Sequence, residues 1–307
     1  MHPPISLIFF FILAGLSIGS FTVIFIFNIF FEGLERQLEI NRYLSLILIA
    51  LGAFSASFHL GHKLRAWKVI KGFKTSWLSR EAVFSFVFGL FLLISAVLPH
   101  YYSSLAKVVD LVALISGWLG AFSTAMIYTG NRFVPEWNTS LNTFYFINMY
   151  LTMGSALSSC ILFRTGNIKE AKISIFLTLI FISSGAILRV SYHIRQHFIR
   201  RATLEDALNL SQNRSIKVLD KGSTTDNYCT KEFYYEKGKK ILGQIQFLAY
   251  IFAFLIPFFL YLFGYSVALN PILMPLSLIV LIIGTFAERW CFFVEGRHVQ
   301  NLYYGLL

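Results

Sequence analysis

Residues 6–31 read SLIFFFILAGLSIGSFTVIFIFNIFF, a run of 26 residues that contains no Lys, Arg, Asp or Glu. Because a helix rises about 1.5 Å per residue, a run of this length can cross the roughly 30 Å hydrocarbon core of a bilayer. A signal peptide would carry a basic segment before the run and a small-residue cleavage site after it, and the sequence shows neither. We therefore expect this segment to remain in the protein as its first membrane-spanning helix.

The remainder of the chain has the same character. Of its 307 residues, 56% are hydrophobic and only 13% are charged, a balance that soluble domains rarely have. Apolar stretches long enough to span a membrane recur along the whole length. They lie at about 6–31, 43–60, 79–99, 106–128, 142–163, 171–193, 243–265 and 269–293. The sequence thus predicts an all-α polytopic membrane protein, a bundle of eight transmembrane helices.

One connection between the predicted spans is much longer than the others. Residues 194–242 contain ten Lys or Arg and six Asp or Glu, so this segment cannot lie in hydrocarbon. The chain shows no internal repeat and no low-complexity tract. We expect residues 1–307 to form a single transmembrane domain with a long basic extramembrane loop at about 194–242.

Basic residues are concentrated in the loops after the second and sixth predicted helices, which emerge on one face of the membrane. The positive-inside rule then predicts a cytoplasmic N-terminus. A second interpretation is that this basic face docks an acidic protein partner. We assign Lys68, Lys71, Arg200 and Arg201 to such a surface, although lysines at helix ends also commonly extend to the lipid headgroups.

Ionisable residues next to spans are candidates for function, because a charge in the bilayer is costly. The segment FHLGHKLRAWKVIKGFKTSWLSREAVF (58–84) places His59 in the last turn of the second predicted helix and Glu81 in the first turns of the third. Since one loop joins these helices, we expect His59 and Glu81 to lie at similar depth and to line one pocket. The alternative is a surface ion pair between Glu81 and Arg65 or Arg80.

A lipophilic carrier such as quinol releases two protons when it is oxidised, so its site needs proton acceptors near the membrane boundary. The carboxylate of Glu81 and the imidazole of His59 meet that need. Arg65 would hold a quinone oxygen or set the charge state of Glu81.

The segment HLGHKLRAWKVIKGFKTSWLSREA (59–82) resembles the signature of the membrane anchor subunits of dimethyl sulfoxide reductases, in which an HLG-x-x-x-R-A segment is followed by LS-x-E. PEWNTSLN (135–142) falls where that family has a Pro-x-Trp loop, and ERWCFFVEGRH (288–298) is similar to its closing Arg, aromatic pair, Gly and His. The resemblance covers the whole chain. The chain departs from the family at His62 and Lys63, where the family commonly has Ser-Pro.

The resemblance implies a multi-pass subunit of a prokaryotic cytoplasmic (inner) membrane that has no redox cofactor of its own. It would anchor a ferredoxin-like iron–sulfur subunit and a molybdopterin catalytic subunit, which reduces the terminal acceptor. The anchor would oxidise quinol, with menaquinol expected, and pass the electrons to the iron–sulfur subunit during anaerobic respiration. By analogy, His59, Arg65 and Glu81 bind the quinol, and Glu81 and His59 act as catalytic proton acceptors.

Metal and haem sites are not predicted in this chain. Cys160, Cys229 and Cys291 lack the spacing of a zinc or iron–sulfur site, so any metal would belong to a partner subunit. The seven histidines fall at the ends of spans or beyond them, whereas haem in membrane anchors is held between His pairs within spans. His193 and His197, four residues apart, are expected near the end of the sixth helix.

A secondary transporter is the alternative function. It predicts inverted repeats or broken spans with polar groups near the midplane, and the two halves of the chain show no such correspondence. Glu288 keeps two interpretations open, a self-neutralising pair with Arg289 or a proton-relay carboxylate. Arg189 is expected to extend to the membrane interface.

Overall fold

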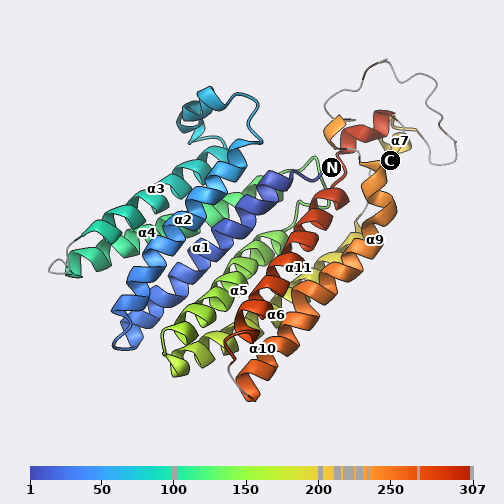
Figure 1. Cartoon of the computed structure of the whole chain (residues 1–307). Coiled ribbons are helices and arrows are strands. Elements are labelled where there is room, and N and C mark those ends of the chain that lie inside the picture. Colours follow the sequence, from blue (N-terminus) through green and yellow to red (C-terminus); the bar gives the residue numbers. More distant parts are fainter. Residues whose placement is uncertain are drawn as a thin grey trace.

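The protein is a bundle of long helices (Figure 1). The computed structural model describes residues 1–98, 103–199, 203–210, 216, 225, 231–233, 235–267 and 270–304. In these ranges there is no β-strand, and eight helical stretches are long and apolar enough to cross a bilayer. The prediction of an all-α polytopic bundle is confirmed. Within the loop at 194–242, residues 200–202, 211–215, 217–224, 226–230 and 234 lie outside the described residues, and elsewhere His100 does too. Cys229 is among those loop residues.

Seven of the spans are single α-helices and one contains a turn of π-helix. The single helices are α1 (Ile5–Phe30), α2 (Glu35–Ser57), α3 (Trp77–Val97), α4 (Ser103–Thr129), α5 (Ser140–Arg164), α6 (Ile168–Phe198) and α11 (Leu273–Glu295). The remaining span runs through α9 (Glu236–Tyr250), the π turn η3 (Ile251–Leu255) and α10 (Ile256–Ser266).

Several helices extend beyond the apolar runs that predicted them. The second span was expected to start near residue 43, yet α2 begins at Glu35. Its first turns bury Gln37, Leu38 and Asn41 against the protein. Hydropathy marks only the part of a helix that meets hydrocarbon, so helical turns held by the neighbouring protein surface are missed.

The connections after the second and fourth helices, and both ends of the described chain, lie at one end of the bundle (Figure 1). The loop after α2 contains a 3₁₀ helix, η1 (Lys63–Gly72), and the chain ends in another, η4 (Val299–Tyr304). The Val299 N–H donates to the Phe133 carbonyl at 2.9 Å, which ties the C-terminal segment to the loop after α4. We call this the η1 end of the bundle.

Helix α1 lies at the centre and is buried along most of its length between α2, α5 and α11 (Figure 1). Its close contact with α5 depends on glycine. A Cβ atom on Gly154 of α5 would clash with the backbone of Gly19, and one on Gly15 would clash with Met153. Gly15 and Gly19 form a small-xxx-small pair, which allows two membrane helices to approach closely.

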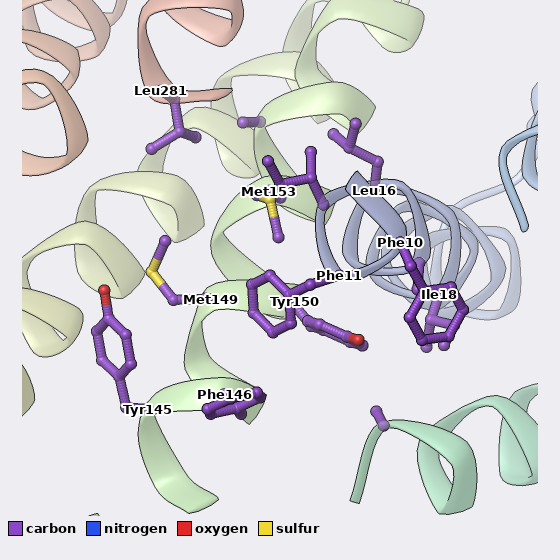
Figure 2. Close-up of a cluster of buried hydrophobic side chains, with 14 of the residues drawn as sticks. Phe10, Phe11, Leu16, Ile18, Tyr145, Phe146, Met149, Tyr150, Met153 and Leu281 are labelled. Atoms are coloured by element: carbon purple, nitrogen blue, oxygen red, sulfur yellow. The ribbon is translucent and has the colours of Figure 1, made fainter. Parts of the chain in front are cut away.

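Large side chains fill the space beside this glycine contact. Figure 2 shows Phe11 of α1 beside Phe146 and Tyr150 of α5, and Leu281 of α11 on another side of the cluster. The Phe11 ring centroid lies 5.0 Å from those of Phe146 and Tyr150. Helices α1, α5 and α11 therefore share one packed core.

Hydrogen bonds join α1 to α2 on its other side. The Ser17 hydroxyl donates to the Ser45 carbonyl at 2.7 Å, and the Ser45 hydroxyl donates to the Ser17 carbonyl at 3.2 Å. One turn further, the Ser20 hydroxyl donates to the side-chain oxygen of Asn41 at 3.1 Å. Such bonds contribute about 0.6 kcal/mol each on average in membrane proteins, so glycine packing and hydrogen bonds together hold α1 in place.

We expect Gly154→Leu to destabilise the protein by about 3 kcal/mol, the upper range for overpacking a tight core, because the new side chain must separate α1 from α5. Gly243→Leu is the matched control, since Gly243 lies in α9 with no atom near its Cβ position. The midpoint of thermal unfolding of the purified protein in detergent measures both effects. Equal midpoints for the two variants would show that the glycine contact is dispensable.

Candidate functional site

Glu81 lies in the second turn of α3, at the η1 end of the bundle. The helix starts after Ser76, whose hydroxyl accepts a hydrogen bond from the Ser79 N–H. The Glu81 side chain faces the bundle and Glu81 is only 8% exposed. Its position in the first turns of the third span is the one that the sequence predicted.

The partner of Glu81 is a hydroxyl group from the next helix. The Thr124 Oγ1 of α4 lies 2.5 Å from the Glu81 Oε1, and it lies 3.1 Å from the Gly120 carbonyl oxygen. Tyr128 of α4 and Tyr150 of α5 are close enough to interact electrostatically with Glu81. Glu81 is thus surrounded by neutral polar groups.

The alternative of a surface ion pair at Glu81 is wrong. Arg80 donates to the Phe73 and Lys74 carbonyls at 3.0 and 2.8 Å, and its guanidinium lies 4.2 Å from the ring centroid of Trp77. Arg65 is exposed in η1, and neither arginine forms a salt bridge with Glu81. The Glu81 carboxylate is too deeply buried to form a surface ion pair. The Arg80 side chain points to the backbone carbonyls of Phe73 and Lys74 instead.

The prediction for His59 needs a correction. Helix α2 ends at Ser57, so His59 lies beyond the helix rather than in its last turn. The N–H groups of Phe58 and His59 bond to carbonyls three residues earlier, which tightens the chain and ends the α-helix. His59 is exposed and makes no hydrogen bond or salt bridge with Glu81 in the described structure. Its quinol-binding role stays a prediction.

The predicted docking residues that the structure describes are accessible. Lys68 and Lys71 are exposed in η1, with their amino groups 5.9 and 5.4 Å from the ring centroid of Trp67. Arg200 and Arg201 lie outside the described residues. The structure therefore places two of the four at the η1 end.

Aromatic rings connect the surroundings of Glu81 to the two other sequence motifs. The Tyr128 ring lies one turn beyond Thr124 on α4, and its centroid is 5.4 Å from that of Trp137 and 5.3 Å from that of Phe292. The Trp137 indole donates to the Phe292 carbonyl at 2.9 Å, and the two rings stack. Segments 135–142 and 288–298 thus pack together beside the Glu81 site.

Glycine and histidine complete this contact. A Cβ atom on Gly296 would lie 2.5 Å from the Trp137 ring, so only glycine fits beneath the indole. His298 packs between Phe133 and Phe233, with centroid distances of 5.6 and 5.0 Å. Burial lowers the pKa of His298 below its usual range, which keeps the ring neutral at pH 7.

A second group of buried charges joins α6 to α11. Arg189 lies 3.0 Å from Glu288 and 2.9 Å from Glu295, and the Arg289 Nε donates to Glu288 at 2.6 Å. Gln246 of α9 also donates to Glu295, at 2.6 Å. The predicted pairing of Glu288 with Arg289 is confirmed, and it is part of a larger network.

Arg189 does not extend to the membrane interface as expected. It is 2% exposed and points into the bundle, because two carboxylates of α11 attract it there. Arg289 is 1% exposed, and its guanidinium lies within 5.0 Å of the ring centroids of Phe11, Tyr145, Phe146 and Phe292. The sequence showed this network only as charged residues within apolar runs. It did not indicate which of these residues pair with each other.

Asp110 of α4 is neutralised in the same way. It is fully buried, and Arg42 of α2 approaches it with two nitrogens, the closer at 2.5 Å. Of the acidic side chains buried in the described spans, Asp110, Glu288 and Glu295 thus pair with arginine. Glu81 instead pairs, within the described part of the chain, with the Thr124 hydroxyl alone.

Comparison with known proteins identifies relatives over the full length. The family model described as "DMSO reductase anchor subunit (DmsC)" matches residues 1–306. The chain is also similar to a sulfite dehydrogenase subunit of Allochromatium vinosum, with 28% identity over 330 aligned residues that cover 99% of both chains. The family resemblance seen in the sequence motifs is confirmed.

Removing Arg189 should leave the buried Glu295 carboxylate without its arginine and Glu288 with Arg289 alone. We expect Arg189→Met to destabilise the protein by about 3–5 kcal/mol, the usual cost of breaking a buried ion pair from one side. Adding Glu295→Gln should recover part of the loss. Glu236→Gln, which removes the exposed pair with Lys240, is the control and should change little. Thermal unfolding in detergent measures all three, and an unchanged midpoint for Arg189→Met would contradict a stabilising network.

Proposed function

The chain belongs to the family of DMSO reductase anchor subunits, and from this premise we propose that it passes electrons between membrane quinol and an iron–sulfur partner subunit and takes up the protons that quinol releases. As a multi-pass anchor it is part of an oxidoreductase complex. Family membership does not specify the chemistry of the anchor itself, and for this we propose quinol oxidation. The membrane would be the cytoplasmic membrane of a prokaryote, and menaquinol the expected carrier.

The observation that carries the proposal is that no basic side chain of the described residues forms an ion pair with Glu81. Among the buried acidic side chains of the described spans, the other three form ion pairs with arginine. Among the residues that the structure describes, Glu81 has the Thr124 hydroxyl alone as its hydrogen-bond partner. A membrane carboxylate in such surroundings can change its protonation state during a reaction, which is what a proton acceptor requires.

Oxidation of one quinol yields one quinone, two protons and two electrons. The electrons pass one at a time to an oxidised iron–sulfur cluster of the partner subunit. Glu81 accepts one proton from a quinol hydroxyl, and His59 accepts the other and returns it to water, which its exposed position permits. Arg65 contacts a quinone oxygen. The molybdopterin subunit then uses the electrons, so this chain does not choose the terminal substrate.

The direction of electron flow has two candidates. The family description refers to a reductase, for which the anchor would oxidise quinol. The similar protein of Allochromatium vinosum is named for a sulfite dehydrogenase, an enzyme that removes electrons from its substrate. In a complex of that kind the anchor would reduce quinone, and Glu81 would supply a proton instead of accepting it.

The docking surface is proposed at the η1 end. Lys68 and Lys71 are exposed there, close to the start of α3 that carries Glu81. An acidic surface on the iron–sulfur subunit would bind them and bring its nearest cluster towards the quinol site. Arg200 and Arg201 would extend the same surface.

Glu81→Gln should abolish quinol-dependent reduction of the partner's iron–sulfur clusters while the complex still assembles. The expected loss is at least about a hundredfold, because a positioned general base contributes on that order. The rate is followed by electron paramagnetic resonance after mixing membranes with a short-chain menaquinol analogue. Glu32→Gln, which changes an exposed acid in the loop after α1, is the control. A normal rate in Glu81→Gln would remove Glu81 from the mechanism.

The double variant Lys68→Glu/Lys71→Glu should release the iron–sulfur subunit from membranes, because it reverses two charges of the proposed surface. Sedimentation of membranes followed by detection of the partner subunit measures retention as the salt concentration rises. The matched control, Lys169→Glu/Lys172→Glu, reverses two exposed charges at the start of α6, at the other end of the bundle. Equal retention in both variants would contradict docking at η1.

A further inference from the structure

We propose that Thr124 is a positioning residue that lets Glu81 gain and lose a proton without moving. The inference rests on the proposed function, because it concerns the residue assigned there as proton acceptor. The Thr124 hydroxyl lies between two oxygens, the Glu81 carboxylate at 2.5 Å and the Gly120 carbonyl at 3.1 Å. Both Thr124 and Glu81 are buried, at 5% and 8% exposure, so they depend on each other for hydrogen bonds.

A threonine hydroxyl can donate one hydrogen bond and accept others, and this property suits both states of Glu81. When Glu81 is ionised, the Thr124 hydroxyl donates to the carboxylate. When Glu81 is protonated, its own O–H donates to the Thr124 oxygen, and the threonine proton turns to the Gly120 carbonyl. Only hydrogen positions change between the two states. Each state keeps the buried hydroxyl and the carboxyl group bonded to each other, and losing such a bond would be costly.

Threonines in membrane helices often bond to the carbonyl four residues earlier for purely local reasons. In this protein Thr22, Thr152 and Thr178 make this carbonyl bond at 2.6, 2.8 and 2.8 Å, and Thr22 and Thr178 also bond to neutral side chains of other helices. Thr124 differs, because its carbonyl distance is longer at 3.1 Å and its shortest contact is the carboxylate of another helix. Its orientation therefore favours Glu81 over the local bond.

Other polar groups near Glu81 do not replace Thr124 as its direct hydrogen-bond partner. The groups that interact electrostatically at the site are Tyr128 of α4, Tyr150 of α5 and Arg289 of α11. Arg289 is already bonded to Glu288. The Tyr150 hydroxyl lies beside the Thr124 hydroxyl, although the two do not form a hydrogen bond of good geometry. The Thr124 hydroxyl is the group that makes direct contact with the Glu81 carboxylate.

The test compares variants of the assembled complex in membranes. Thr124→Val keeps the shape of the side chain but removes the hydroxyl, and Thr124→Ser keeps the hydroxyl. Thr152→Val is the matched control, because it loses a local carbonyl bond at 2.8 Å in α5 with no carboxylate involved. The rate of cluster reduction by the menaquinol analogue is measured across pH and quinol concentration, with Glu81→Gln in parallel.

We expect Thr124→Val to lower the maximal rate about tenfold or more, since a hydrogen bond to a charged group is lost. The quinol concentration for half-maximal rate should stay within about twofold and the pH profile should be displaced, because proton transfer rather than binding is affected. Thr124→Ser should restore both rate and profile, and Thr152→Val should resemble the parent protein.

Infrared difference spectra supply a second measurement that needs no quinol. The band of the protonated Glu81 carboxyl group is identified by its loss in Glu81→Gln. This band should move to higher frequency in Thr124→Val and should have the frequency of the parent protein in Thr124→Ser. A parent-like rate and an unmoved band in Thr124→Val would overturn the role of Thr124, while a lost rate in Glu81→Gln would still support the proposed function. A normal rate in Glu81→Gln would overturn both.

Discussion

A carboxylate inside a bilayer-spanning bundle must be stabilised by a cation, a proton or hydrogen bonds, and this constraint organises the interior of the protein. Arg42 neutralises Asp110, and Arg189 with Arg289 neutralises the acids of α11. These pairs tie helices together and hold their charges in place. Glu81 is stabilised differently, by the hydroxyl of Thr124. The difference separates groups that serve the structure from one that is suited to exchange a proton.

The position of Glu81 depends in turn on how the helices pack. Glycine contacts bring α1 against α5, and the resulting core places the Phe146 ring beside Tyr128 of α4 and Phe292 of α11. Tyr128 then links the surroundings of Glu81 to Trp137 and to the last turns of α11. Three sequence motifs that are far apart along the chain thus meet at one end of the bundle. That is the end at which a soluble partner subunit is proposed to dock.

Much of the fold could be predicted because a bilayer imposes one simple rule on sequence. Each span must be apolar and about 20 residues long, so the eight runs could be recognised. The predicted ends were less accurate, as α2 and His59 show, because helices continue or stop outside hydrocarbon for local reasons. The family could be inferred from the motifs around His59, Trp137 and Arg289, and Glu81 was placed correctly in the first turns of its helix.

The sequence by itself determined the class of protein, the number of its spans, its family and the acids that were candidates for function, because hydropathy and motifs are local properties of the chain. It did not determine which cation meets which acid. Arg189 was expected at the interface and instead pairs with two residues about a hundred positions away, and Thr124 showed no signal at all. Those pairings arise only when helices distant in sequence pack side by side, so the tertiary structure alone decided which carboxylates are neutralised and which one is left to a hydroxyl.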